Sequence, residues 1–178
     1  KWKRYWLVDP LDGTKEFIKK NGEFTVNIAL IENNKPTLGV IYVPTKSTLY
    51  FAQQNFGSFK INITSELNSL DGAKKIFVSN QKVIERVIGS RSHSNQDFDN
   101  WIKKNFPNSG IVQAGSSYKF CLIAEGIADI YPRFGPTSEW DIAAGHIIVN
   151  EAGGKIETFN NNHINYNTKE DILNPQFY

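Results

Sequence analysis

Two aspartates lie three residues apart where an apolar segment ends, and this arrangement constrains the chain more than any other feature. The apolar run at residues 5–8 predicts a buried strand, and Asp9 and Asp12 follow directly after it. Pro10 lacks a backbone N–H and Gly13 tolerates a positive φ, so we expect the chain to leave the sheet here in a tight turn. Such a turn directs carboxylate oxygens toward one point, and oxygen clusters of this kind suit hard cations such as Mg²⁺.

The same segment also fits two other interpretations. Asp-Gly is a common turn pair, and an aspartate before a helix is a common N-cap, so Asp12 would then have only a structural role. Alternatively, the backbone N–H groups of Gly13 and Thr14, at the start of a helix, would receive a phosphate group. This segment alone leaves the metal, phosphate and turn interpretations open.

A second acidic motif lies far along the chain, where Ser138 precedes a predicted helix. Ser138 and Asp141 fit a capping box, in which Asp141 lies in the first helical turn. Asp141 therefore either only caps this helix, or it also faces the first pair of carboxylates. Small side chains would let the helix pack closely against another element. The apolar and small residues at helical spacing are Trp140, Ala143, Ala144, Gly145, Ile147 and Ile148.

The pattern of the chain changes near residue 75. Before it, alternating apolar residues predict an antiparallel sheet lobe over residues 1–75 that carries the first motif, and the polar residues 64–75 are expected to form a linker. After it, short strands alternate with helices, which predicts a smaller α/β lobe over residues 76–178 that carries the second motif. We expect strands at residues 24–30, 38–43, 49–52, 58–63, 76–78, 83–88, 111–112 and 128–131, and helices at 15–20, 96–105, 116–125 and 139–151.

Composition limits the classes of partner. The net charge of the 178 residues is only +2 and no dense basic run occurs, which argues against a nucleic-acid polymer as partner. Cys121 is the single cysteine, so no internal disulfide forms, and we expect a reducing, cytoplasmic location. No apolar stretch reaches the length of a transmembrane segment, while peripheral association with the inner membrane stays open. The oligomeric state is not indicated.

Taken together, the two acidic motifs resemble the inositol monophosphatase superfamily of Mg²⁺-dependent phosphatases. The resemblance implies the α/β fold of these sugar phosphatases, with layered sheets and helices (α+β). The longer pattern resembles the bacterial 3'(2'),5'-bisphosphate nucleotidase branch. The segments that carry the resemblance are residues 6–17, 21–29, 90–93, 122–126, 131–141 and 173–175.

The resemblance implies a site with two or more Mg²⁺ ions. Asp9 would bridge two ions, and the backbone carbonyl of Leu11 would bind one of them. Asp12 and Asp141 would bind the other ion. Asp9, Asp12 and Asp141 would thus be catalytic as metal ligands, and Leu11 and Asp141 would also lie against the substrate.

The resemblance also implies how a phosphate ester would bind. The backbone N–H groups of Gly13 and Thr14 would hold phosphate oxygens, and the Thr14 hydroxyl would orient the attacking water. For Lys119, a solvated helix charge and a phosphate contact are both open. His93 is either a surface histidine in a polar turn or a nucleotide contact. The residues expected to contact the nucleotide are His93, Gly115, Ser116, Ser117 and Lys119.

The activity implied by this resemblance is removal of the 3'-phosphate of adenosine 3',5'-bisphosphate, which gives AMP and phosphate, as in sulfate assimilation. Its partner would be this small nucleotide bisphosphate. Alternatives are an inositol monophosphatase, a sugar-bisphosphate phosphatase, or an inactive nucleotide-binding fragment. An aspartyl-phosphate phosphatase fits less well, because its two aspartates lie two residues apart. Members of the superfamily also carry a helical segment with two acidic groups before the first motif, and we expect a chain opening at Lys1 to lack it.

Overall fold

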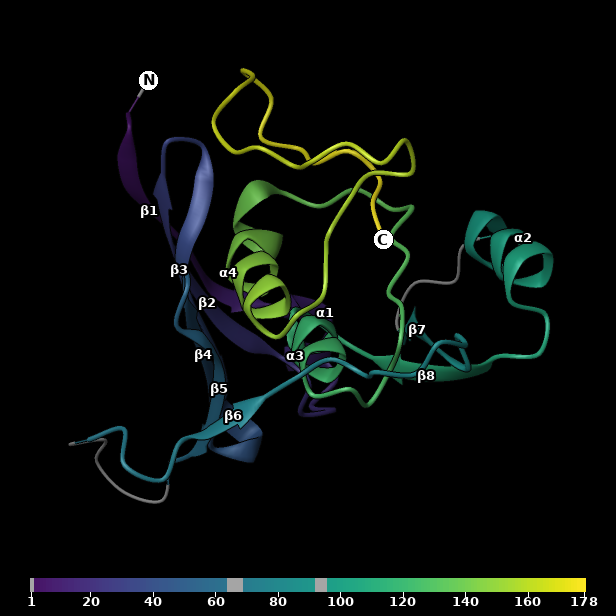
Figure 1. The fold of residues 1–178 in the computed structure, drawn as a ribbon, viewed down its shortest axis with the longest axis horizontal. Helices are drawn as coiled ribbons and strands as arrows, with labels where there is room; N and C mark the ends of the chain where they lie inside the picture. The colour runs from purple at the N-terminus through teal and green to yellow at the C-terminus, as the bar shows by residue number, and fades with distance from the viewer. Residues whose placement is uncertain (1, 64–68, 92–95) are drawn as a thin grey trace.

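A single antiparallel sheet dominates the structure, a computed structural model that describes residues 2–63, 69–91 and 96–178. Its strands follow one another in the order of the sequence, so each pairs with its neighbour along the chain (Figure 1). The short connections are typical of a meander. The strands are β1 (Arg4–Asp12), β2 (Thr25–Glu32), β3 (Lys35–Val43), β4 (Thr48–Gln53), β5 (Gly57–Asn62) and β6 (Lys74–Ile76).

Strand β1 continues through Pro10 to Asp12, so the expectation that the chain leaves the sheet at Pro10 is wrong. Proline is tolerated there because β1 is an edge strand, which pairs only with β2. The pairing register nevertheless shifts by a bulge, with Asp9 opposite Asn27 and Asp12 opposite Thr25. The bulge re-aims the end of the strand. The short helix α1 (Thr14–Ile18) follows it.

Residues 74 and 75, expected in a linker, instead belong to β6, which pairs with β5. The expected strand at residues 76–78 overlaps β6 only at Ile76, because the first residues of β6, Lys74 and Lys75, are charged and exposed. Charged lysines are a common feature of edge strands.

A second, smaller sheet consists of the parallel strands β7 (Arg86–Ser90) and β8 (Gly110–Ala114), which helix α2 (Gln96–Asn105) connects. The expected strand at residues 128–131 is reduced to an isolated parallel bridge between Ile130 and Val87. The expected strand at residues 76–78 is wrong for residues 77 and 78, and Ile76 belongs to β6 of the large sheet. The remaining alternation of strand and helix in this half of the chain is as expected.

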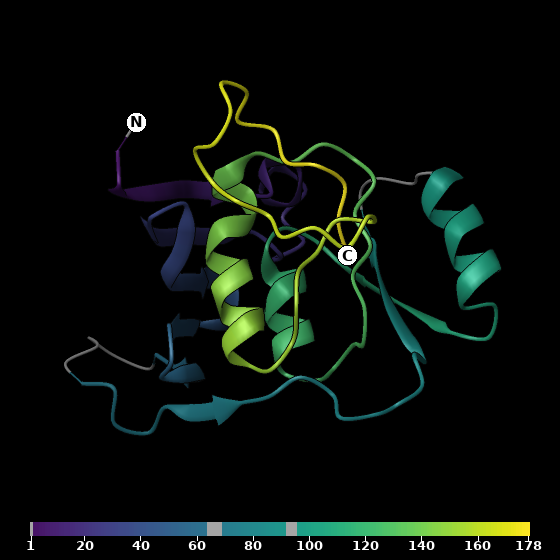
Figure 2. The ribbon, with the colours of Figure 1, turned by 45° about the horizontal axis from the view of Figure 1, so that its top comes forward.

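Helices α3 (Tyr118–Ala124) and α4 (Glu139–Glu151) lie side by side between the two sheets (Figures 1 and 2). Helix α4 packs on the inner face of the large sheet, mainly against β3 and β2. The approach is close, because a Cβ added to Gly39 of β3 would lie 2.4 Å from Ile147 Cγ2 and 2.6 Å from the Ala144 carbonyl oxygen. The expected role of small residues in close helix packing is thus confirmed. The division of the chain at residue 75 stays a prediction.

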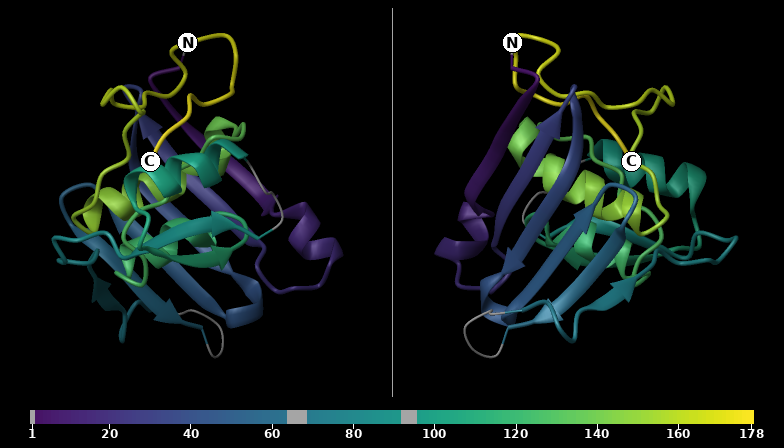
Figure 3. Two further views of the ribbon diagram at one scale, coloured as in Figure 1. Left: turned by 90° about the vertical axis from the view of Figure 1, so that its right-hand side faces the viewer. Right: turned by 60° about the vertical axis from the view of Figure 1, so that its left-hand side comes forward.

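The opposite face of the large sheet turns away from these two helices (Figure 3, right). Trp6 and Val8 of β1 are 56% and 50% exposed on this side. Among the described residues, no helix is both long enough and apolar enough to cross a membrane.

Candidate active site

Three carboxylates from distant parts of the chain meet at one point. Asp9 and Asp12 come from the bulged end of β1, and Asp141 comes from the first turn of α4. One carboxylate oxygen of each lies within 4.8 Å of the others, and all three side chains are half-buried. The fold therefore brings the two acidic motifs together.

The bulge in β1 fixes the orientation of Asp9. Its Oδ1 accepts a hydrogen bond from the backbone N–H of Leu11 at 3.0 Å, which is the geometry of an Asx turn. Burial raises the pKa of Asp9, and the nearby charge of Asp12 adds to this effect. The carboxylate is thus held rigidly in a place where its negative charge is poorly solvated.

A serine from the other half of the chain holds Asp12. Ser117 donates its backbone N–H to Asp12 Oδ2 at 2.6 Å, and its hydroxyl lies 2.5 Å from the same oxygen. The Asn27 amide is 3.4 Å from Oδ2 and 2.9 Å from the Ser117 hydroxyl. The Ser117 hydroxyl also lies 2.7 Å from the main-chain oxygen of Asp141, so it links both acidic motifs.

Asp141 caps α4 and faces the other carboxylates at the same time. The Ser138 N–H donates to Asp141 Oδ2 at 2.7 Å, as expected for a capping box. Burial raises the pKa of Asp141 to about 6, and the charges of Asp12 and Asp9 contribute to the shift. The two interpretations of Asp141 are therefore compatible.

The donor set fits a hard cation. Three carboxylates in mutual proximity repel one another when ionised, and the raised pKa values of Asp9 and Asp141 reflect that cost together with burial. A divalent ion relieves both effects. Because all the ligand atoms are oxygens, the cluster suits Mg²⁺ better than Zn²⁺.

A cavity of about 230 Å³ lies beside the carboxylates. Its lining residues include the cationic side chains of Lys119 in α3 and of Arg133, together with Gly13 and Thr14 at the start of α1. An anionic ligand would therefore meet positive charge on one side and the acidic cluster on the other. The remaining lining residues are Asp12, Lys15, Glu16, Ser90, Ser116, Ser117, Phe120, Tyr131, Thr137, Asp141 and Ile142.

Lys119 is buried, so it is not the solvated helix charge that was one of its two interpretations. Its Nζ donates to the Ser116 carbonyl at 2.7 Å and lies 5.4 Å from the centre of the Tyr131 ring. Burial lowers the pKa of Lys119 to about 8, against the opposing effect of the Asp12 charge. The cation is thus poorly solvated at the wall of the cavity.

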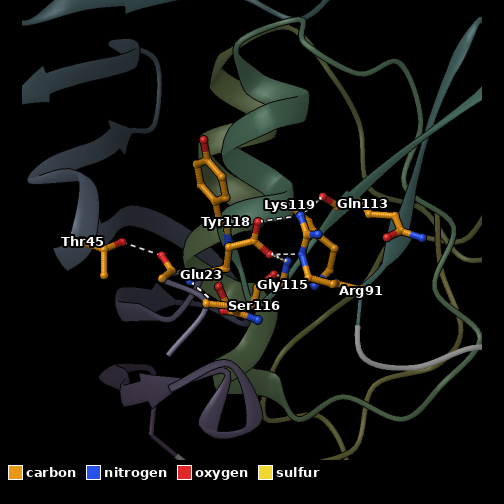
Figure 4. Close-up of polar contacts among 10 residues, drawn as sticks. Glu23, Thr45, Arg91, Gln113, Gly115, Ser116, Tyr118 and Lys119 are labelled. Carbon is orange, nitrogen blue, oxygen red and sulfur yellow. Dashed lines mark hydrogen bonds and ion pairs between the residues drawn. The ribbon is translucent and has the colours of Figure 1, made fainter. Parts of the chain in front are cut away.

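The segment from Gly115 to Ser117 forms the turn that leads into α3 (Figure 4). The helix therefore begins at Tyr118, two residues later than expected. Ser116 has a left-handed backbone with φ of 48°. A Cβ on Gly115 would lie 2.5 Å from Glu16 Cγ, and one on Gly13 would lie 3.0 Å from Ser116 Cβ. The glycines are required because the two turns press directly against each other.

Comparison with known proteins decides the family. The sequence profile described as "Inositol monophosphatase family" matches residues 1–176. The chain belongs to the inositol monophosphatase family.

Relatives within this family are similar over nearly the whole chain. The chain is 51% identical to a protein from Buchnera aphidicola named "3'(2'),5'-bisphosphate nucleotidase CysQ", over 99% of this chain and 64% of that protein. It is 44% identical to the Salmonella typhimurium protein of the same name, over 99% of this chain and 68% of the relative. A crystal structure of CysQ from Bacteroides thetaiotaomicron superposes with a TM-score of 0.90 at 44% identity, over 99% of this chain and 69% of that one. The chain thus spans about two thirds of the length of these relatives.

His146 and Cys121 have packing roles, whereas the candidate His93 cannot be placed. His146 is buried with Nδ1 2.9 Å from the Tyr166 hydroxyl, and burial lowers its pKa to about 4. Cys121 is buried as well, and burial raises the pKa of its thiol. Both side chains are therefore part of the packed interior. His93 lies outside the described residues.

Sequence reasoning missed several residues of the site. Asn27 and Ser117 received no role at the carboxylates, and Arg133 received none at the cavity. Asn27 offered no clear signal, because it lies between the alternating apolar residues of its strand, and only the structure shows that its side of β2 faces inward. Glu23 and Arg91 offered no sequence signal of a role near the site.

Proposed function

We propose that this family member is a Mg²⁺-dependent phosphatase that removes the 3'-phosphate of adenosine 3',5'-bisphosphate, giving AMP and phosphate. The observation that carries the proposal is the meeting of Asp9, Asp12 and Asp141 within 4.8 Å beside a cavity lined by Lys119 and Arg133. The choice of nucleotide rests on the relatives, whose names specify a bisphosphate nucleotidase.

In this proposal two or more Mg²⁺ ions are held by Asp9, Asp12, Asp141 and the carbonyl of Leu11. Bound divalent ions lower the pKa of a water and stabilise charge on a leaving oxygen, which is the chemistry that ester hydrolysis needs. The chain must hold its carboxylates correctly oriented. Ser117 does this for Asp12, and the turn at Leu11 does it for Asp9.

The residues of the cavity would bind and orient the phosphate ester. The backbone N–H groups of Gly13 and Thr14, at the start of α1, would bind phosphate oxygens, and the Thr14 hydroxyl would orient the attacking water. The ammonium of Lys119 and the guanidinium of Arg133 supply positive charge for anionic oxygens. Gly115 and Ser116 would form the wall next to the nucleotide, with His93 as a further contact.

The chain spans 64% of the length of the Buchnera relative, so turnover by these 178 residues alone is tested separately from the choice of substrate. Inositol phosphates and sugar bisphosphates are alternative substrates within the same family.

The test is phosphate release from adenosine 3',5'-bisphosphate, inositol 1-phosphate and fructose 1,6-bisphosphate, each with Mg²⁺ and with a chelator. The 178-residue chain is assayed beside the same chain joined to the N-terminal segment of the Salmonella relative. Asp141→Asn is the inactive variant, and Asp71→Asn, in an exposed turn, is its matched control.

We expect Mg²⁺-dependent release with preference for the nucleotide, loss of release in Asp141→Asn, and no change in Asp71→Asn. Release only from the extended chain would show that turnover by these residues requires the added N-terminal segment. A preference for inositol phosphate, or release that survives the chelator, would contradict the proposal.

The proposed location is the cytoplasm, supported by the single buried thiol of Cys121. Attachment to the inner membrane gains no support from the comparisons. Cell fractionation followed by detection of the protein tests both.

A further inference from the structure

Glu23 lies outside the cavity, yet it contacts the turn that holds Asp12. The residue sits between α1 and β2, and its side chain is only 16% exposed. Its Oε2 accepts the backbone N–H of Gly115 at 2.8 Å and Arg91 Nε at 2.8 Å (Figure 4). Its Oε1 accepts Arg91 Nη2 at 2.9 Å. One carboxylate thus joins the loop before β2, the end of β7 and the turn before α3.

Arg91 extends this network to β8. Its Nη2 also donates to the carbonyl oxygen of Gln113 at 2.8 Å, two residues before Gly115. The guanidinium therefore holds the Glu23 carboxylate through two bonds and holds the β8 end through a third. Paired, charge-assisted bonds of this kind fix orientation more strongly than neutral ones.

The turn from Gly115 to Ser117 needs such external support. Ser116 has a left-handed backbone, which is unfavourable for a residue with a side chain, and Gly115 has no space for a Cβ. Ser117, the next residue, presents its N–H and hydroxyl to Asp12 Oδ2 at 2.6 and 2.5 Å. A shift of the turn would therefore move both groups away from the carboxylate.

We propose that Glu23, clamped by Arg91, is a positioning residue for the metal site: it anchors the Gly115 N–H, and through Ser117 it fixes the orientation of Asp12. The inference deepens the proposed function, on which it rests for the role of the metal. Partners that orient metal ligands change metal affinity or activity by roughly 10- to 100-fold when they are removed.

The test compares Glu23→Gln with Glu32→Gln. Glu32 stands at the far end of β2 and is likewise paired with an arginine, Arg4, at 2.6 Å, but it is remote from the carboxylate cluster. Mn²⁺ serves as the probe, and its dissociation constant is measured by electron paramagnetic resonance in the full chain. Hydrogen exchange at the amides of Gly115 and Ser117 and the melting temperature are measured on the same samples.

We expect Glu23→Gln to weaken Mn²⁺ binding by roughly tenfold or more and to accelerate exchange at both amides. Glu32→Gln should leave both readouts unchanged at a similar melting temperature. Arg91→Lys keeps the positive charge but loses the paired donors of the guanidinium, so we expect an intermediate loss of Mn²⁺ affinity. This variant provides the test if Glu23→Gln does not fold. Unchanged Mn²⁺ binding in the folded variants would overturn the inference.

Phosphate release separates this inference from the proposed function. A parent chain that releases phosphate while Glu23→Gln binds Mn²⁺ normally refutes the positioning role alone. A parent chain that releases no phosphate, but whose Mn²⁺ affinity falls in Glu23→Gln, refutes the proposed reaction alone.

Discussion

The hydroxyl of Ser117 lies 2.5 Å from Asp12 Oδ2, although the two residues are 105 positions apart in the sequence. The backbone N–H of Ser117 reaches the same oxygen at 2.6 Å. Ser117 therefore bonds Asp12 through two groups, and only one of them depends on its side chain.

Replacing Ser117 with alanine removes the hydroxyl and keeps the backbone bond. We expect Mg²⁺ to bind about tenfold more weakly, because a ligand carboxylate loses one of its two short orienting bonds from Ser117. Isothermal titration with Mg²⁺ measures the change. Ser109→Ala is the control, since the Ser109 hydroxyl bonds only to the nearby Phe106 carbonyl in the loop before β8. Equal affinities for the two variants would contradict the orienting role.

Metal binding should weaken as the pH falls through about 6. Burial raises the pKa of Asp141 to about 6 in the metal-free protein, so a proton competes with the cation for this carboxylate below that pH. Titrations with Mg²⁺ between about pH 5 and about pH 8 measure how the apparent affinity changes with pH. This interval extends about one to two units on either side of the pKa of Asp141. An apparent affinity that does not change across this interval would contradict the assignment.

The contribution of Asp141 to the stability of the metal-free protein should increase as the pH falls, whereas metal binding weakens. A carboxyl whose pKa is raised on folding binds more protons in the folded state, so its contribution to stability falls as the pH rises from 3.8 toward 6. Asp141→Asn keeps an oxygen for the Ser138 N–H and removes the charge. We expect the free energy of unfolding at pH 7 to rise by about 1 kcal/mol, allowing for partial exposure, and metal binding to disappear. Urea denaturation with and without Mg²⁺ provides the measurement.

Lys119→Met tests the cation at the wall of the cavity. The substitution keeps most of the apolar stem and removes the ammonium, so we expect KM for a phosphate ester to rise by roughly tenfold, as for the loss of one charge-assisted bond. Because burial lowers the pKa of Lys119 to about 8, the KM of the parent should also rise above pH 8. A KM that stays constant with pH in the parent, or that equals the parent value in Lys119→Met, would exclude this contact.

Gly39→Ala tests the close packing of α4 on β3. The new Cβ would lie 2.4 Å from Ile147 Cγ2 and 2.6 Å from a backbone oxygen, which cannot move aside easily. We expect a loss of about 1–3 kcal/mol in the free energy of unfolding, as for other overpacked cores. Gly110→Ala is the control, because its Cβ would meet only the Glu85 carbonyl at 3.8 Å. Thermal denaturation of both variants measures the difference.

Patterns within single segments predicted much of this molecule. Alternation identified the strands of the sheet, and the capping box at Ser138 and Asp141 located the start of α4. The first residues of the charge-rich strand β6 were missed because they carry no alternation, and the course of β1 past Pro10 was missed because edge position is a property of the whole sheet.

Sequence patterns were limited in the same way in predicting the side-chain contacts of the site. The acidic motifs were visible because each is compact in sequence. The contacts of Ser117 with Asp12 and of Glu23 with Gly115 were not, because the partners come from elements that only tertiary packing brings together. Periodicity and turn propensities describe neighbours along the chain and contain no information on such pairs.

The long separation between Asp9 and Asp141 has a consequence during protein synthesis. A ribosome makes the chain from its N-terminus, so β1 and most of the large sheet emerge long before α4 is available. A nascent chain that ends before Asp141 exposes two repelling carboxylates and lacks the third carboxylate of the cluster. Retention of a cation would thus report that translation has passed α4 and that the helix has docked.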